Sequence, residues 1–323
     1  MLGCISTEDK WFQYVIAVLR RVPGFTPLLG VGKAVLQYVF HQPNPLFQLL
    51  YCIVIGTCYT VFVQTCWSHF PNSLAGALHR EASVAVILAC VVSFAWVCSS
   101  PPIKVGKGVS RYRFDGLMFK EKNKCVTCKL VKPARSKHCS VCGVCVQRFD
   151  HHCVWINGCV GRGNHRLFVL FLFVHVMLCF YGFFLLSSVL YHIVVDQNLI
   201  HATFVDGRGN TFKATSGLIF RYVMLKHLSV ITLMVLALVM GCALVIFLGY
   251  HVWLVLRNKT TNETAKISDL YWELYQQQEA LKQVKKNDKT LPIGHLTKEQ
   301  IQRSERFYDR GLWKNILEVL WVE

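Results

Sequence analysis

Four long runs of apolar residues constrain the fold of this chain more than any other feature of the sequence. They occupy residues 46–67, 82–98, 167–195 and 228–256. A helix needs about 20 mainly apolar residues to cross the hydrocarbon core of a bilayer, and the last two runs are long enough to tilt or to extend beyond it. Soluble cores rarely repeat uncharged runs of this length. We therefore expect four transmembrane helices rather than the buried helices of a large soluble protein.

The composition favours a membrane protein whose charges are concentrated in its water-exposed parts. Hydrophobic residues make up 53% of the 323 residues and charged residues 16%, with a net charge of +17. A soluble domain usually has about 25% charged residues. These values argue against a disordered chain, an ordinary soluble enzyme and a disulfide-rich mini-protein. Because the basic residues flank the apolar runs, anionic lipid headgroups explain the net charge more simply than a nucleic acid, and no nucleic-acid partner is expected.

The distribution of charge predicts the orientation. Residues 99–166 hold 14 Lys/Arg and 3 Asp/Glu, whereas residues 68–81 hold one Arg and one Glu. The positive-inside rule therefore predicts that residues 99–166 lie in the cytosol. With four spans, the N-terminal segment 1–45 and the C-terminal tail 257–323 are expected to be cytosolic as well. The membrane is predicted to be that of the endoplasmic reticulum, the Golgi or the cell surface.

Two shorter apolar stretches precede the first run. Residues 11–19 are too short to span a bilayer and are followed by Arg20 and Arg21, so we expect an interfacial helix there. Residues 28–40 contain two glycines and Lys33 and are also expected to lie at the surface. An additional span within residues 11–40 is the alternative.

A cysteine-rich cluster lies in the predicted cytosolic segment between the second and third runs. Seven of the 15 cysteines and three histidines fall between residues 125 and 159. The pairs Cys125/Cys128 and Cys139/Cys142 have the Cys-x2-Cys spacing that supplies two zinc ligands from one tight turn. A reducing cytosol disfavours disulfides as the rival use of paired cysteines. Two zinc sites would use eight of these ten residues, and spacing alone does not say which two remain. The eight cysteines outside the cluster are expected to be incidental, and most would behave as small hydrophobes in or near the spans.

The complete pattern resembles the DHHC family of protein S-acyltransferases. The resemblance rests on the run Cys125-x2-Cys128-x9-His138-Cys139-x2-Cys142-x2-Cys145-x4-Asp150-His151-His152-Cys153-x5-Cys159-x4-Asn164-x3-Phe168. It is strengthened by Thr260-Thr261-Asn262-Glu263, which directly follows the fourth apolar run and matches the family's Thr-Thr-x-Glu motif. The fold implied is an all-α integral membrane protein with four transmembrane helices. A small cytosolic zinc-binding domain, residues 99–166, lies between the second and third spans.

The resemblance also assigns the metal ligands. It implies one Zn²⁺ bound by Cys125, Cys128, His138 and Cys145, and a second bound by Cys139, Cys142, His152 and Cys159. Because each metal would have four protein ligands and no open position, both zinc ions are expected to be structural rather than catalytic.

By the same resemblance, Cys153 is the nucleophile, His151 its base and Asp150 the group that orients His151. A free cysteine has a pKa near 8.5, so only a few per cent is thiolate at neutral pH, and an adjacent histidine would increase that fraction. The reaction implied has two steps. Cys153 takes a long-chain acyl group from palmitoyl-CoA, and a cysteine thiol of a membrane-associated protein then takes it from Cys153. The expected partners are therefore acyl-CoA, such protein substrates and the lipid bilayer.

Three residues are implied in the acyl-CoA site, namely Lys132, Trp155 and Thr261. Lys132 is implied as a contact of the CoA phosphates, and the alternative is that it belongs to a solvated basic face together with Lys129, Arg135 and Lys137. Trp155 is expected to pack at the membrane edge close to Cys153. Thr261 is expected to form a hydrogen bond with Asp150.

Two positions depart from the family pattern. Residues 99–102 read Ser-Ser-Pro-Pro where the family often has Asp-Pro-Gly, and Arg306 stands where its tail often has asparagine. The tail shows helical i, i+3, i+4 periodicity from Ile267, and Thr297 with Gln300 predicts a capping box. The helical faces would dock on the zinc domain, lie on the membrane or bind a partner.

The rival functions are a catalytically silent zinc adaptor in the membrane, a zinc module that binds nucleic acid, and a metal transporter. The intact Asp150-His151-x-Cys153 sequence argues against the adaptor. Spans on both sides of the cluster argue against the nucleic-acid module, and a scarcity of polar groups in the spans argues against the transporter.

Overall fold

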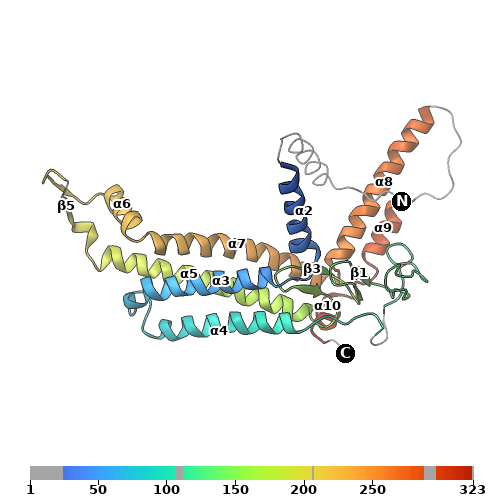
Figure 1. Ribbon diagram of the computed structural model, residues 1–323, viewed down its shortest axis with the longest axis horizontal. Coiled ribbons are helices and arrows are strands. Elements are labelled where there is room, and N and C mark those ends of the chain that lie inside the picture. Colours follow the sequence, from blue (N-terminus) through green and yellow to red (C-terminus); the bar gives the residue numbers. More distant parts are fainter. Residues whose placement is uncertain (1–24, 107–111, 206, 287–295, 322–323) are drawn as a thin grey trace.

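The computed structural model describes residues 25–106, 112–205, 207–286 and 296–321. Within these ranges, four helices are long and apolar enough to cross a membrane. They are α3 (Leu46–Cys66), α4 (Leu78–Ser99), α5 (His165–Val195) and α7 (Leu228–Leu256), and they lie side by side in Figure 1. The prediction of four spanning helices is confirmed. Helix α4 begins four residues before the apolar run because its first turn contains the polar residues His79, Arg80 and Glu81, which hydropathy excludes but a helix tolerates.

Helices α5 and α7 approach each other closely at Gly241. A side chain built at Gly241 would place its Cβ 3.1 Å from Cβ of Cys179 on α5. Small residues at helix contacts are the usual means by which membrane helices pack tightly, because lipid provides no hydrophobic drive between them. The glycine in the fourth span therefore serves helix packing.

Two small antiparallel hairpins and the tail helices lie together at one end of the spans (Figure 1). The first hairpin joins β1 (Lys137–Cys139) to β2 (Val144–Val146), and the second joins β3 (His151–Cys153) to β4 (Gly158–Val160). The tail forms α8 (Thr261–Lys286), α9 (Lys298–Glu305) and α10 (Leu312–Leu320). The opposite end of the bundle carries three short helices and one hairpin. The helix η1 (Trp67–His69) continues α3, and η2 (Leu199–His201), β5 (Thr203–Val205), β6 (Thr211–Lys213) and α6 (Ser216–Lys226) connect α5 to α7.

The second hairpin is joined to the spans by a continuous apolar cluster. Ile156 and Val160 of the second hairpin pack with Phe94 and Val97 of α4 and with Phe168 of α5. Because apolar contacts of this kind hold both elements against the same core, the second hairpin is fixed to the ends of α4 and α5.

The first part of α8 and α9 dock on the cysteine-rich domain. Ile267 and Ile301 are buried against Met118, Phe119 and Ala134. The capping box at the start of α9 is confirmed, with Thr297 accepting from the Gln300 N–H and the Gln300 side chain accepting from the Thr297 N–H. Of the three roles open to the tail, docking on the zinc domain is the one found for these two helices.

Helix α2 (Phe25–His41) runs across the direction of the spans in Figure 1 and exposes Val31, Val35 and Phe40. Asn44 fixes the corner between α2 and α3, because its Nδ2 donates to the carbonyls of Tyr38, Val39 and Gln42. The surface location predicted for residues 28–40 stays a prediction. The interfacial helix predicted for residues 11–19 lies outside the described residues.

Candidate functional site

The eight residues implied as zinc ligands form two separate groups of four. In one, the ligand atoms of Cys125, Cys128, His138 and Cys145 lie within 4.8 Å of one another, and in the other the same holds for Cys139, Cys142, His152 and Cys159. Each group combines a Cys-x2-Cys turn with a pair of residues directly opposite each other on a hairpin. The pairs are His138 with Cys145 in β1–β2 and His152 with Cys159 in β3–β4.

The donor distances fit tetrahedral zinc. Zn–S and Zn–N bonds of about 2.3 and 2.0 Å in a tetrahedron separate sulfur from nitrogen by roughly 3.5 Å. Nδ1 of His138 lies 3.3 Å from Sγ of Cys128 and 3.7 Å from Sγ of Cys145. In the second group, Nδ1 of His152 lies 3.3 to 3.7 Å from its three sulfur partners. Three thiols and an imidazole at these separations are a donor set for zinc, and the two groups could each hold one ion.

Both Cys-x2-Cys turns close in the same way. The residue after the second cysteine has a left-handed backbone, with φ of 60° at Lys129 and 66° at Gly143. The amide of the second cysteine donates to the first sulfur, from Cys128 to Cys125 and from Cys142 to Cys139. The left-handed turn returns the chain so that both sulfurs face the same point.

Strand β3 directs the side chains of the two adjacent histidines to opposite faces. Successive side chains of a strand point to opposite faces. His152 faces the second group of metal donors, so His151 and Cys153, one residue before and one after it, lie together on the other face. This alternation is the physical reason why His152 joins the cysteines of the second group and His151 does not, a distinction that spacing in the sequence leaves open.

His151 is held by Asp150, and Asp150 is held by the start of α8. Nδ1 of His151 lies 2.7 Å from Oδ2 of Asp150. The backbone N–H of Thr261 donates to Oδ1 of Asp150 at 2.8 Å, and its hydroxyl donates to Oδ2 at 2.9 Å. The carboxylate is buried. Thr261 therefore contacts Asp150, as the resemblance implies, and reaches the site through that residue.

The pKa values of these side chains favour an ion pair between thiolate and imidazolium. Burial disfavours the charged form of each side chain, but the hydrogen bonds and charges of neighbouring groups outweigh the effect of burial. They hold the pKa of Asp150 well below its usual range and raise the pKa of His151 to about 9. The hydrogen bond and charge of His151, together with the amides of Trp155 and Ile156, lower the pKa of the Cys153 thiol. A lowered thiol pKa is what a nucleophilic cysteine needs.

Cys153 lies where the hairpin meets the spans. It packs against the apolar cluster of Phe94, Val97 and Phe168. Trp155, 45% exposed, stacks edge-on against Phe47 in the first turn of α3 with ring centroids 5.3 Å apart. The nucleophile candidate is thus at the level where apolar helix ends meet polar residues.

A residue that the sequence analysis did not single out also reaches this site. His251 of α7 is 1% exposed, and one of its ring nitrogens lies within 4.8 Å of atoms of Asp150 and His151. Neither ring nitrogen has a hydrogen-bond partner among the described residues. A histidine in the last turns of an apolar span is itself a signal of function, and this signal could have identified it.

The basic stretch before the first hairpin divides into two kinds of residue. Lys132 and Lys137 lie close enough to Lys266 of α8 for their charges, after burial, to lower the pKa of Lys266. Arg135 instead points inward and is completely buried. The solvated-face interpretation is therefore wrong for Arg135, and Lys266 joins Lys132 and Lys137 in a cluster of cations.

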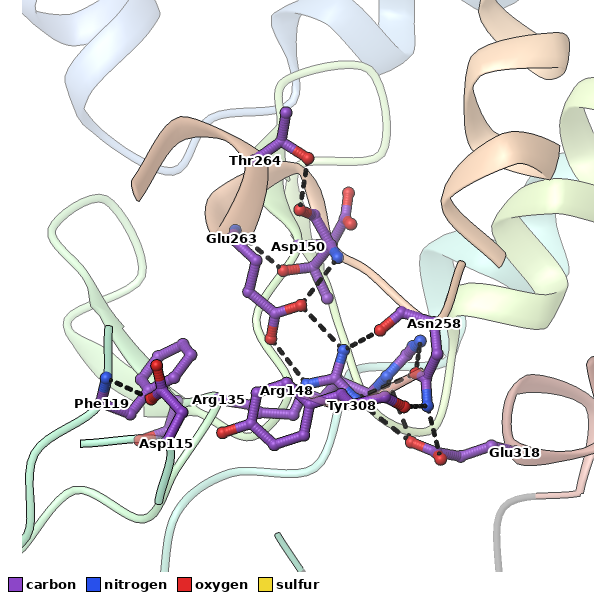
Figure 2. Close-up of polar contacts among 12 residues, drawn as sticks. Asp115, Phe119, Arg135, Arg148, Asp150, Asn258, Glu263, Thr264, Tyr308 and Glu318 are labelled. Atoms are coloured by element: carbon purple, nitrogen blue, oxygen red, sulfur yellow. Dashed lines mark hydrogen bonds and ion pairs between the residues drawn. The ribbon is translucent and has the colours of Figure 1, made fainter. Parts of the chain in front are cut away.

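Arg135 joins the cysteine-rich domain to the tail (Figure 2). Its guanidinium donates to both carboxylate oxygens of Glu263, at 2.6 and 2.9 Å, and to the side chain and carbonyl of Asn258. The guanidinium carbon Cζ of Arg135 lies over the rings of Tyr112 and Tyr308, 4.8 and 4.4 Å from their centroids. The glutamate of the Thr-Thr-x-Glu run thus neutralises a buried arginine of the zinc domain while Thr261, two residues earlier, holds Asp150.

The two departures from the family pattern are accommodated. Asn164 donates to the carbonyl of Ser100, a backbone contact that does not depend on the side chain at residues 99–102. Arg306 is exposed. Asn315, further along the tail, is fully buried and donates to Asp309 and to the carbonyl of Leu256.

Comparison with known proteins identifies the domain that contains this site. Residues 118–268 match the model of the DHHC palmitoyltransferase family. The chain carries a DHHC palmitoyltransferase domain. It is 29% identical over 322 residues to palmitoyltransferase ZDHHC4 of Bos taurus, an alignment that covers 98% of this chain and 87% of the relative. It is 28% identical over 311 residues to palmitoyltransferase swf1 of Schizosaccharomyces pombe, covering 90% and 79% of the two chains.

The resemblance to the DHHC family is thereby confirmed. A third relative, palmitoyltransferase ZDHHC23 of Rattus norvegicus, is 45% identical over 98 residues, covering 30% of this chain and 22% of the relative. The DHHC domain, residues 118–268, extends from the cysteine-rich segment through α5 and α7 into α8. It therefore includes both groups of metal donors, the candidate nucleophile and the threonine that contacts Asp150.

Proposed function

We propose that this chain is a protein S-acyltransferase that moves a long-chain acyl group, typically palmitoyl, from acyl-CoA to Cys153 and then to cysteine thiols of membrane-associated proteins. The observation that carries the proposal is the hydrogen-bonded series from Thr261 to Asp150 to His151, with Cys153 on the same strand face as His151. A base held by a carboxylate beside a thiol is the arrangement of nucleophilic catalysis.

Before the first step, the thiol proton of Cys153 has passed to His151, which gives the thiolate–imidazolium pair that the pKa values favour. The resulting thiolate attacks the carbonyl carbon of the acyl-CoA thioester, the bond to the CoA sulfur breaks, and the CoA thiolate takes the proton from His151. Asp150 stabilises the imidazolium that exists between these two proton transfers. The products are free CoA and an acyl thioester at Cys153.

In the second step, the thiol of a protein substrate supplies the attacking group. His151 removes its proton, the new thiolate attacks the acyl thioester, and Cys153 leaves as a thiolate that recovers the proton. Two successive transfers through a covalent intermediate predict ping-pong kinetics.

Two structural zinc ions would support this geometry. A zinc ion bound in each group of donors would fix the fold of its hairpin, and four protein ligands would leave it no open position. His152 would thereby lock the register of β3, so that the positions of His151 and Cys153 follow from metal binding on the opposite face.

The cations Lys132, Lys137 and Lys266 are proposed to receive the phosphates of CoA. Their mutual repulsion, expressed in the lowered pKa of Lys266, would be relieved by an anion. The acyl chain would then enter the apolar layer beside Cys153, where each buried methylene contributes about 0.8 kcal/mol. Trp155 at the edge of this layer would cover the thioester.

The excess of Lys/Arg in residues 99–166 supports a cytosolic location for the zinc domain and both termini. We propose a multi-pass protein of the endoplasmic reticulum, the Golgi or the plasma membrane, acting on cysteines that face the cytosol. Epitope tags at either end should be accessible to antibody after selective permeabilisation of the plasma membrane.

The direct test is acylation of the purified protein. We expect wild type, incubated in detergent with labelled palmitoyl-CoA, to acquire label that neutral hydroxylamine removes, and Cys153→Ser to acquire none. Cys242→Ser, an exposed cysteine of α7 away from the site, is the matched control and should label as wild type does.

If the purified protein takes no label, zinc analysis of the same samples distinguishes an intact but inactive protein from one that has lost its metal. Protein that holds about two zinc ions per chain and takes no label would be the catalytically silent membrane adaptor. Equal labelling of wild type and Cys153→Ser would exclude Cys153 as the nucleophile.

A further inference from the structure

A cavity of about 330 Å³ lies between the second hairpin, the start of α5 and helix α10. Its walls carry four permanent cations, Arg148, Arg162, Arg310 and Lys314. Among the described residues that line it, Glu318 is the single carboxylate. The residues proposed for catalysis and for CoA do not line this cavity, so it is separate from the site at Cys153.

Glu318 is already shared among several arginines. One of its oxygens lies 3.3 Å from Arg135 and 3.8 Å from Arg148, and the other lies 3.8 Å from Arg310. The same carboxylate accepts a hydrogen bond from Asn258, as Figure 2 shows. One negative charge divided among these groups leaves the cavity positive, and an uncompensated positive cavity attracts anions.

The cavity is fixed at the ends of two spans. Nδ2 of Asn315 in α10 donates to the carbonyl of Leu256, the last residue of α7, at 2.8 Å. Arg166, in the first turn of α5, donates to the carbonyl of Leu320 at 2.7 Å. Because α5 and α7 are long enough to cross the bilayer, α10 and the cavity lie at the depth of the lipid headgroups.

Helix α10 presents an apolar face beside this cavity. Trp313 is 75% exposed and Trp321 70%, and Leu312, Leu317 and Leu320 are also exposed. Leu317 and Trp321 line the cavity as well. Tryptophan and leucine on one side of a helix at the ends of spans are the pattern of an interfacial helix. A ligand at this place therefore meets cations on one side and apolar side chains on the other.

We propose that this cavity binds the headgroup of an anionic phospholipid, with the acyl chains along Leu317 and Trp321. The occupant is amphipathic because the site is, which favours a lipid over a free phosphate. Since Arg148 and Glu318 also belong to the network around Arg135, the bound lipid stabilises the docking of α10 and of the tail on the zinc domain. The proposal does not depend on acyl transfer.

The test compares lipids retained by the full-length protein in native mass spectrometry. Samples are purified from nanodiscs of phosphatidylcholine containing either phosphatidylserine or phosphatidylinositol. We expect wild type to retain anionic lipid in preference to phosphatidylcholine. The double variant Arg310→Gln/Lys314→Gln should bind it about thirtyfold more weakly, the combined effect of two cations near an anionic surface. The matched control Lys298→Gln/Arg303→Gln removes two exposed cations of α9 that do not line the cavity and should behave as wild type.

Two further measurements identify the ligand and show whether its binding depends on catalysis. Soluble inorganic phosphate and CoA are added as competitors; displacement of the lipid by either at micromolar concentration would assign the cavity to that anion and overturn the proposal. Equal retention by both double variants would overturn it too. Cys153→Ser should retain lipid as wild type does, so that a failure of the acylation assay and a failure of lipid binding are separate results.

Discussion

At the scale of single residues, Asp150 has a partner for each carboxylate oxygen. Oδ1 accepts from the backbone of Thr261, while Oδ2 accepts from the hydroxyl of Thr261 and pairs with His151. Four adjacent residues of the sequence contain the carboxylate, the base and the nucleophile that we propose, yet the residue that fixes the carboxylate is 111 residues away. The orientation of His151 therefore depends on where α8 begins.

Replacement of Thr261 by valine should reduce acylation of Cys153 about tenfold. The change removes one hydrogen bond to a charged acceptor, which contributes about 1.5 kcal/mol, and keeps the backbone bond. Initial rates of labelling by palmitoyl-CoA measure the effect. Thr264→Val is the matched control, because it removes a hydroxyl of the same helix that donates to the carbonyl of Thr260 rather than to Asp150. Equal rates for both variants would show that the hydroxyl of Thr261 has no part in positioning Asp150.

Sequence could predict the residues of this site that are close together and could not predict those that the fold brings in. The run from Asp150 to Cys153 is local, and its resemblance to a family assigns roles to its members. Lys266 belongs to a tail helix, and no spacing relates it to Lys132. The position of His251 within a span is a signal of function, but no spacing relates His251 to Cys153. The inward direction of Arg135 was equally hidden, because its partners Glu263 and Glu318 are distant in the chain.

At the scale of elements, the two-residue repeat of β3 separates the candidate metal donors from the residues that we propose for catalysis. His152 turns to the donors on one face, and its two neighbours turn to the other. The assignment of adjacent histidines thus follows from strand geometry, although the sequence alone shows only two histidines in succession.

The variants His151→Ala and His152→Ala should therefore differ in zinc content. His151→Ala should keep about two zinc ions per chain and lose acylation, since it removes the base only. His152→Ala should retain about one and also lose acylation, because the register of β3 is no longer fixed. Metal analysis of the purified proteins measures this difference. A loss of zinc in His151→Ala that matched the loss in His152→Ala would contradict the alternation.

The contact between α5 and α7 gives a second test at this scale. Gly241→Leu should lower the midpoint of thermal unfolding in detergent, because its side chain would collide with Cys179 and Phe180, and overpacking typically costs 1–3 kcal/mol. Gly249→Leu, on the same helix with nothing within 4 Å of its Cβ position, is the control and should unfold near the wild-type temperature.

At the scale of the whole molecule, the network around Arg135 holds three parts of the chain together. Arg135 comes from the zinc domain, Glu263 from α8 and Glu318 from α10. The network is buried, so its charged groups are stabilised by one another rather than by water. The tail helices are consequently a structural part of the catalytic half of the molecule.

Glu263→Gln should destabilise the protein by about 3 kcal/mol, because removing one partner of a buried pair leaves the other charge uncompensated. We expect the midpoint of thermal unfolding to fall by several degrees and protease to release the tail earlier than from wild type. Glu273→Gln changes an exposed glutamate of the same helix and should leave both measurements unchanged. Unchanged unfolding of Glu263→Gln would mean that the pair does not hold the tail.

The sequence predicted the four spans because hydropathy is a property of each segment taken alone. The segment boundaries were less accurate, as at α4, where polar residues continue the helix. The position of α10 could not be predicted, because it depends on the carbonyl of Leu256 meeting Asn315 and on the shared carboxylate of Glu318. Such contacts are decided by the packing of the complete chain.

The alternation along β3 also determines which changes this segment can tolerate over evolutionary time. Inserting or deleting one residue between Asp150 and Cys153 would turn every later side chain to the opposite face. Cys153, the proposed nucleophile, would then point towards the group of metal donors, and His152 would point away from it. We therefore expect natural variation here to consist of substitutions alone. Changes of length belong in exposed connections such as residues 207–210, between β5 and β6, where a longer loop costs little free energy.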